Sequence, residues 1–259
     1  MDVVVCVKRV PDASGMDALV IDASRKDIER RTLVAKINDW DEYALEAAAQ
    51  LKEKAGVSLT AVTVGPDEWD DVLRRALAMG ADRAIRVDED MLAADCHAVS
   101  TVLAALVRTL PHDLVLFGAQ SEDFGSGQLG VMVAEMLGIP HAALVVGLEV
   151  GEGSVRVDRE LEAGALESYA IELPALLTIQ TGVNRPRYIS VGGIRRAMKK
   201  DLQIMSVSEL GLTAEMLAPQ AVLERLETPP RGKEAELISG PPEETAERLV
   251  GILRNAGIL

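Results

Sequence analysis

The stretch DLVLFGAQSEDFGSGQLGVMVAE, residues 113–135, decides the fold prediction. Its pattern predicts a buried strand over 113–117, a polar loop rich in glycine, and a helix that begins near Gln128. In an open α/β sheet, ligands bind beyond the carboxyl ends of the strands, which is where this loop would lie. A helix N-terminus offers unpaired N–H groups and the positive end of a dipole, so the stretch is typical of a phosphate site.

The loop itself is compatible with two interpretations. Gly125 and Gly127 allow the backbone to approach an anion, and Ser126 can donate a hydroxyl hydrogen bond. The pattern is neither GxGxxG nor a Walker A loop, so the motif alone has little specificity. The alternative is a plain glycine-rich loop in which Ser126 only caps the following helix.

The chain on the amino-terminal side of this stretch alternates between strand and helix patterns. Val3 to Val7 form a continuous apolar run, as in a strand that is buried on both faces. We expect further strands at 59–64 and 84–87, and helices at 38–54, 67–80 and 95–110. This alternation predicts an α/β fold with a doubly wound, mostly parallel sheet of the Rossmann-like, adenine-nucleotide-binding kind.

The pattern changes after residue 139. Residues 142–150 and 155–159 predict a hairpin, and 173–179 predict another strand, so antiparallel pieces are added to the parallel core. Residues 219–242 are rich in proline and glutamate and precede an amphipathic helix at 243–255. We therefore expect a nucleotide-binding domain over 1–218 and an extended arm with a C-terminal helix over 219–259.

Composition excludes several classes of function. The formal charge of −14 argues against a nucleic-acid surface. No apolar run approaches the roughly 20 residues that cross a bilayer, so no integral membrane insertion is expected. The start of the chain lacks a signal-peptide pattern, and Cys6 and Cys96 have no CxxC spacing; both points favour a reducing cytoplasm, with Cys6 in the core.

The sequence also lacks the motifs of conventional catalysis. The three histidines have no metal-ligand spacing, and there is no nucleophile elbow or triad. We therefore predict no metal site and no catalytic residue belonging to the chain itself. A carrier whose chemistry resides in a bound cofactor needs neither.

Two other groups of residues stand out. The segments Cys6 to Arg9, Asn38 to Asp41 and Val64 to Pro66 would face the same crevice as the glycine loop, although Asn38 and Asp41 alone could be a helix cap and a first-turn acid. The segment 185–200 carries six basic residues and no acid, which indicates either an anionic or protein partner or a plain solvated loop.

Ordered blocks along the first roughly 205 residues resemble the β subunits of electron transfer flavoproteins. The blocks are VKRVPD at 7–12, NDWDEYALEAA at 38–48, VTVGP at 62–66, LRRALAMGADRAIRV at 73–87, DLVLFGAQ at 113–120 with the DFGSGQ loop, VDRELEAG at 157–164, LPALLTIQTGVNRPRY at 173–188 and KK at 199–200. The resemblance implies a heterodimer with an α subunit that holds most of a shared FAD. It also implies AMP, or the AMP portion of a second FAD, inside this chain.

The resemblance implies a set of site residues by matching position. The cofactor-binding set is Cys6, Asn38, Asp39, Trp40, Asp41, Val64, Gly118, Ala119, Gln120, Asp123, Phe124, Gly125, Ser126, Gly127, Gln128 and Leu129. Glu160 matches an acid at the subunit interface. The segment 181–205 matches the loop that docks acyl-CoA or other flavin dehydrogenases, with the docking set Arg187, Val191, Arg195, Arg196, Lys199 and Lys200.

The resemblance leaves the identity of the inner nucleotide open. The loop is closer to the DGDTAQVG form that is common in bifurcating members, which favours a second FAD and NADH as a substrate there; AMP is the alternative. Family members often have a basic residue in place of Ala119, threonine in place of Ser126, proline in place of Asp39, and leucine-proline in place of Val191-Gly192. A nucleotide-binding regulator of the universal-stress type is the alternative from another class, although the later strands and the docking segment disfavour it. An ATP pyrophosphatase of related fold is a third alternative, but its SGGxDS phosphate loop should follow the first strand, where this chain has VKRVPD.

Overall fold

The computed structural model describes residues 1–14, 19–30, 33–230, 232 and 235–259. The chain divides into two compact units, Met1–Arg225 and Leu226–Leu259. The second unit contains the helix α6 (Pro242–Asn255), which has no buried residue. The sequence-based division at 218/219 and the contact of the arm with an α subunit stay predictions.

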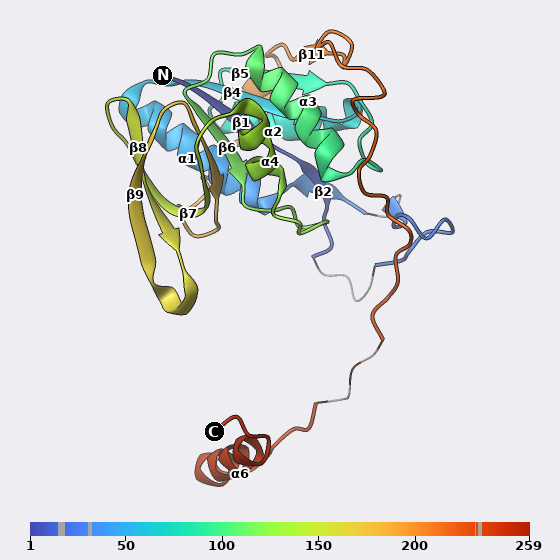
Figure 1. Cartoon of the computed structure of the whole chain (residues 1–259), viewed down its shortest axis with the longest axis vertical. Coiled ribbons are helices and arrows are strands. Elements are labelled where there is room, and N and C mark those ends of the chain that lie inside the picture. The colour runs from blue at the N-terminus through green and yellow to red at the C-terminus, as the bar shows by residue number, and fades with distance from the viewer. Residues whose placement is uncertain (15–18, 31–32, 231, 233–234) are drawn as a thin grey trace. The chain divides into compact units, whose positions relative to one another are not determined.

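A mixed sheet of nine strands, counted over the described residues, forms the centre of the first unit (Figure 1). In spatial order the strands are β11 (Gln203–Met205), β5 (Arg83–Val87), β4 (Ser58–Val64), β1 (Asp2–Cys6), β6 (Leu114–Gly118), β10 (Ala175–Ile179), β7 (His141–Val150), β8 (Ser154–Glu160) and β9 (Leu166–Glu172). The pairs from β11 to β7 are parallel, and β7–β8 and β8–β9 are antiparallel. The predicted doubly wound, mostly parallel sheet is confirmed.

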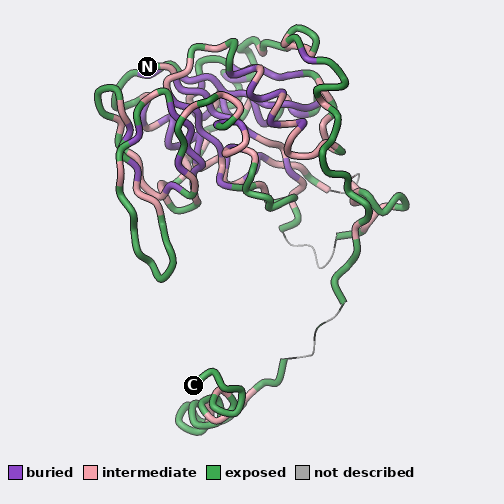
Figure 2. The backbone as a smooth tube through the Cα atoms, viewed as in Figure 1, coloured by how far each residue is buried: buried purple, intermediate pink, exposed green. Residues whose placement is uncertain are grey.

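Helices cover both faces of this sheet because the inner strands are apolar on both sides. Val3 and Val5 of β1 pack in a core with α1 (Asp39–Ala55) and α2 (Asp70–Met79). Val4 and Cys6 point to the other face and pack with α3 (Cys96–Arg108) and α4 (Leu129–Leu137). Figure 2 shows this buried centre, which explains why β1 has no polar alternation.

Short or polar elements were missing from the sequence-based expectation. They are the antiparallel pair β2 (Arg9–Pro11) and β3 (Ala35–Ile37), the turn η3 (Glu162–Gly164), the strands β9 and β11, and the helix α5 (Val191–Ala197). The helix predicted over 67–80 is present as the short turn η2 (Asp67–Trp69) followed by α2. Strand β9 lies at the edge of the sheet and is mostly exposed, so its sequence LESYAIE has no clear apolar face. In addition, β10 is a parallel strand between β6 and β7 rather than an antiparallel addition.

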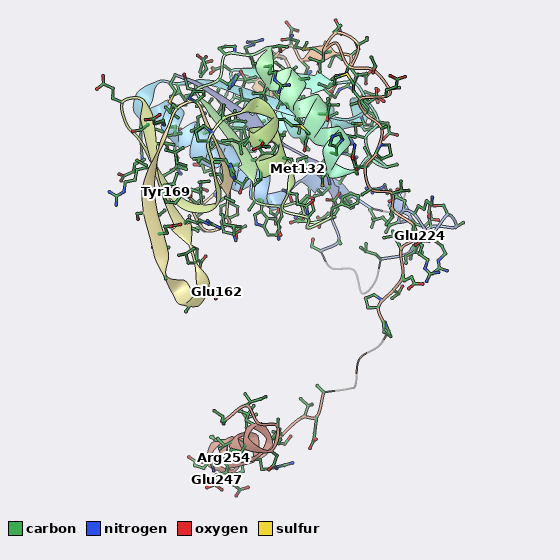
Figure 3. The ribbon with its side chains drawn as sticks, viewed as in Figure 1. Met132, Glu162, Tyr169, Glu224, Glu247 and Arg254 are labelled. Carbon is green, nitrogen blue, oxygen red and sulfur yellow. The ribbon has the colours of Figure 1, made fainter. Side chains whose placement is uncertain are left out.

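Strands β8 and β9 form a long hairpin whose connecting turn carries Glu162, and Tyr169 lies on its second strand (Figure 3).

Within the described residues, no helix has the length and apolarity required to cross a membrane.

Candidate functional site at the carboxyl edge of the sheet

A pocket of about 920 Å³, including space open to solvent, lies at the carboxyl ends of β1, β4 and β6. Cys6, Val64 and Phe117 contribute from the strand ends, and Val99 and Leu103 line it from α3. Its position beyond the strand ends is where doubly wound sheets bind ligands.

Most of the predicted cofactor-binding residues line this pocket. They are Cys6, Asn38, Asp41, Val64, Gly118, Ala119, Gln120, Phe124, Ser126, Gly127, Gln128 and Leu129. The other four lie beside it: Asp39 pairs with Lys36, Trp40 Nε1 donates to Gln180 Oε1, Asp123 pairs with Lys8, and Gly125 sits in the loop at φ 61°. Twelve of the sixteen predicted residues therefore line one pocket, although they span residues 6 to 129 of the sequence.

Asp41 joins two strand ends beneath the pocket. Its Oδ2 accepts a hydrogen bond from the backbone N–H of Lys8 at 2.8 Å, and its Oδ1 accepts one from the backbone N–H of Gly118 at 3.1 Å. A side chain at Gly118 has no room, because a Cβ would lie 2.4 Å from Asp41 Oδ1 and 2.7 Å from Trp40 Cβ. Asp41 is thus more than the first-turn acid of a helix.

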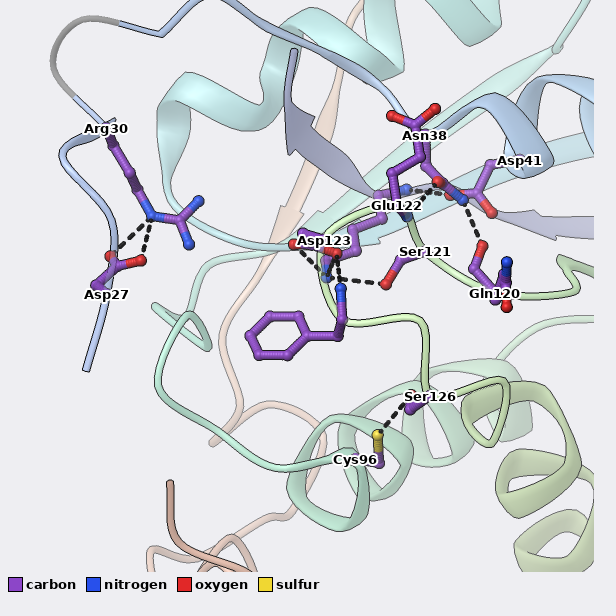
Figure 4. Close-up of polar contacts among 12 residues, drawn as sticks. Asp27, Arg30, Asn38, Asp41, Cys96, Gln120, Ser121, Glu122, Asp123 and Ser126 are labelled. Carbon is purple, nitrogen blue, oxygen red and sulfur yellow. Dashed lines mark hydrogen bonds and ion pairs between the residues drawn. The ribbon is translucent and has the colours of Figure 1, made fainter. Parts of the chain in front are cut away.

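Asn38 holds the glycine loop rather than capping α1. Its Nδ2 donates to the carbonyl oxygen of Gln120 at 2.8 Å, and its Oδ1 accepts from the backbone N–H of Glu122 at 3.1 Å (Figure 4). No side-chain capping bond forms at this helix end. Because Asn38 is only 1% exposed, both bonds are shielded from water.

The glycine loop leads into α4 without a side-chain cap. Gly125 and Gly127 have φ values of 61° and 62°, which favour glycine. Ser126 does not cap α4: its Oγ lies 3.3 Å from the Sγ of Cys96 at the start of α3 (Figure 4), and Gln128 at the N-cap makes no capping bond. The backbone N–H groups of this helix end are therefore available to an anion.

Lys8, two residues after the end of β1, contributes a positive charge to the pocket lining. Its Nζ lies 2.6 and 2.7 Å from the two carboxylate oxygens of Asp123, 3.4 Å from Ser121 Oγ and 4.5 Å from the ring centroid of Phe124. Lys8 thereby ties the loop to β1.

Burial changes the ionisation of two groups in the pocket floor. It raises the pKa of the Asp41 carboxyl to about 7, although the hydrogen bonds from Lys8 and Gly118 act in the opposite direction. Burial, followed by the nearby charge of Asp41, raises the pKa of the Cys6 thiol well above its usual value. Cys6 is therefore a neutral part of the floor and not a nucleophile.

Several lining residues lie outside the predicted cofactor-binding set. They are Val7, Lys8, Thr63, Trp69, Met91, Ala94, Asp95, Cys96, Val99, Leu103, Phe117, Ser121 and Gly130. Val7 and Lys8 were expected at the crevice because they follow the first strand, but no ligand contact was assigned to them. Nothing in the sequence indicated that the lining residues between Met91 and Leu103 belong to the site, because only the fold brings α3 against the glycine loop.

The predicted docking residues differ in their surroundings. Val191, Arg195, Arg196, Lys199 and Lys200 lie exposed on or just after α5. Arg187 instead binds Glu46 on α1, with its Nε 2.7 Å from Glu46 Oε2. The predicted interface residue Glu160 is the exposed last residue of β8 and pairs with Leu166 of β9.

Comparisons with known proteins identify the family of this chain. The family model described as "Electron transfer flavoprotein domain" matches residues 27–210. The chain belongs to the electron transfer flavoprotein family.

The similarity to relatives in the electron transfer flavoprotein family covers more of the chain than the family model does. The electron transfer flavoprotein subunit beta of Bacillus subtilis is 40% identical over 85% of this chain and 86% of its own length. The corresponding subunit of Methylophilus methylotrophus is 37% identical over 88% and 89%. The Caffeyl-CoA reductase-Etf complex subunit CarD of Acetobacterium woodii is 34% identical over the full length of both chains. Family membership assigns the chain to flavoprotein electron transfer.

Proposed function

We propose that this chain is the β subunit of a heterodimeric electron transfer flavoprotein and that its pocket holds the AMP portion of an adenine nucleotide. The observation that carries this proposal is the pocket itself, where a glycine loop and an uncapped helix N-terminus adjoin an apolar cavity. Val64, Val99 and Leu103 suit the faces of a purine ring, while the backbone of Gly127 and Gln128 suits a phosphate.

The pocket needs no catalytic group of its own for this role. A flavin shared with an α subunit would supply the electron-carrying chemistry, and the nucleotide in the pocket would be AMP or the AMP end of a second FAD. With a second FAD, NADH oxidation and electron bifurcation would belong to this subunit. The names of relatives such as the CarD subunit are compatible with this second case.

The deciding experiment is co-expression with the α subunit, followed by chromatography of the nucleotides released on denaturation. One FAD and one AMP per heterodimer would identify a simple carrier. Two FAD and no AMP would identify the second-flavin form. A colourless heterodimer without flavin would overturn the proposal and favour a nucleotide-binding regulator.

The helix α5 and its flanks are the proposed docking surface for an acyl-CoA or other flavin dehydrogenase. Tyr188, Val191 and Met198 are 90%, 63% and 61% exposed, and Arg195 and Lys199 lie exposed among them. Apolar anchors surrounded by positive charge favour an acidic partner surface. Val191→Asp should slow reduction by the dehydrogenase while leaving the bound nucleotides unchanged; an unchanged rate would remove Val191 from the surface.

A further inference from the structure

Lys8 is the one lysine or arginine among the described residues that line the pocket. The acids that line it are Asp41 and Asp95, so without a ligand the lining is not positive. The Lys8 ammonium is already paired with Asp123, whose side chain is only 9% exposed. A cation held by a shielded carboxylate therefore lies at the wall of the proposed nucleotide site.

A nucleotide phosphate would change this balance of charge. A phosphate monoester carries between one and two negative charges near neutral pH. The N-terminus of α4 contributes about half a positive charge. The rest of the phosphate charge must be balanced by a cation. Lys8 can reach a phosphate at the N-terminus of α4, because its side chain is long and flexible and its Nζ already contacts the loop that precedes α4.

We propose that Lys8 balances the charge of the nucleotide phosphate and that Asp123 competes with the phosphate for the Lys8 ammonium. The pair thereby sets the preference of the pocket for a phosphorylated over an unphosphorylated nucleoside. This inference rests on the proposed nucleotide site, and it assigns to Lys8 and Asp123 roles that can be separated from loop anchoring.

The competing explanation is that Lys8 only holds the loop. Loop anchoring would affect adenosine and AMP equally, because both need the loop to be in place. Charge balance would affect AMP alone. The ratio of the two affinities therefore distinguishes the roles, whereas AMP affinity alone does not.

The experiment uses the heterodimer with its α subunit after removal of resident nucleotide. Calorimetric titrations with AMP and with adenosine are compared for the wild type, Lys8→Met, Lys8→Arg and Asp123→Asn. Lys36→Met is the matched control, because Lys36 forms an ion pair with Glu122 of the same loop but does not line the pocket.

We expect Lys8→Met to lower the preference for AMP over adenosine by about 10-fold or more, as for loss of a charge-assisted hydrogen bond. Lys8→Arg should retain the preference, Asp123→Asn should increase it, and Lys36→Met should leave it unchanged. The same ratio in Lys8→Met and wild type would overturn the inference. If Lys8→Met does not fold, an unchanged or lower ratio in Asp123→Asn would overturn it. A wild-type heterodimer that binds neither probe would overturn the proposed nucleotide site as well.

Discussion

The Oδ1 atom of Asp41 accepts a hydrogen bond from the backbone N–H of Gly118, so the first turn of α1 is joined to the end of β6. The two residues lie 77 positions apart. Their contact closes the floor of the pocket just before the glycine loop begins. It also makes the absence of a side chain at position 118 a structural requirement.

Gly118→Ala should destabilise the fold, because its Cβ would lie 2.4 Å from Asp41 Oδ1 and 2.8 Å from the carbonyl carbon of Trp40. We expect a loss of about 1–3 kcal/mol in the free energy of unfolding, measured by urea denaturation. Gly192→Ala is the matched control, since its Cβ would meet nothing closer than 3.6 Å. Equal stabilities of the two variants would contradict the close contact.

Asp41 should make stability depend on pH near neutrality. Burial raises its pKa from 3.8 to about 7, so the folded chain binds this proton more tightly than the unfolded chain does. Raising the pH from about 4 to about 7 therefore removes stability from the wild type. Relative to Asp41→Asn, the wild type should lose stability on the order of 2–4 kcal/mol over this interval. Parallel stability curves for the two proteins would show that Asp41 titrates in its ordinary range.

Arg187 should contribute to stability rather than to docking. Burial alone would raise the pKa of Glu46, but its hydrogen bonds with Arg187 and Gln50 lower it overall. Arg187→Met leaves the carboxylate of Glu46, which is 4% exposed, without its ion pair and should cost about 3 kcal/mol at pH 7.

The loss caused by Arg187→Met should shrink as the pH falls towards 4. In the wild type the lowered pKa of Glu46 stabilises the fold above its usual value of 4.5, and this stability is lost as Glu46 is protonated. Arg195→Met, at an exposed position on α5, should change stability by less than about 0.5 kcal/mol. Similar losses in both variants would contradict a specific role for the Arg187–Glu46 pair.

Asp95 should hold the segment after Pro219 against α3. Its Oδ1 caps α3 by accepting from Ala98 N at 2.9 Å, and its Oδ2 accepts from the backbone N–H groups of Gln220 and Ala221 at 2.7 and 2.8 Å. Asp95→Ala should cost about 1–2 kcal/mol through the cap and speed proteolysis between residues 219 and 225. Ser190→Ala removes only the cap of α5 and should leave that cleavage rate unchanged. Equal cleavage rates in both variants would exclude an anchoring role for Asp95.

The sequence alone determined the doubly wound sheet and the place of the pocket. Short, β-branched apolar runs such as Val3 to Val7 favour strands that are buried on both faces, and the loops at the carboxyl ends of parallel strands meet at one edge of the sheet. These patterns depend on neighbouring residues, so they can be recognised in the sequence alone. The same reading brought the family resemblance, which the comparisons confirmed.

Only the tertiary structure decided which side chains meet. Lys8 pairs with Asp123 across 115 positions, and Arg187 pairs with Glu46 across 141. It also decided that β10 inserts between β6 and β7 and that the polar β9 is a strand, through backbone pairing at the edge of the sheet. Such contacts depend on chain ends and loops converging in space, and neither apolar periodicity nor residue spacing records that convergence.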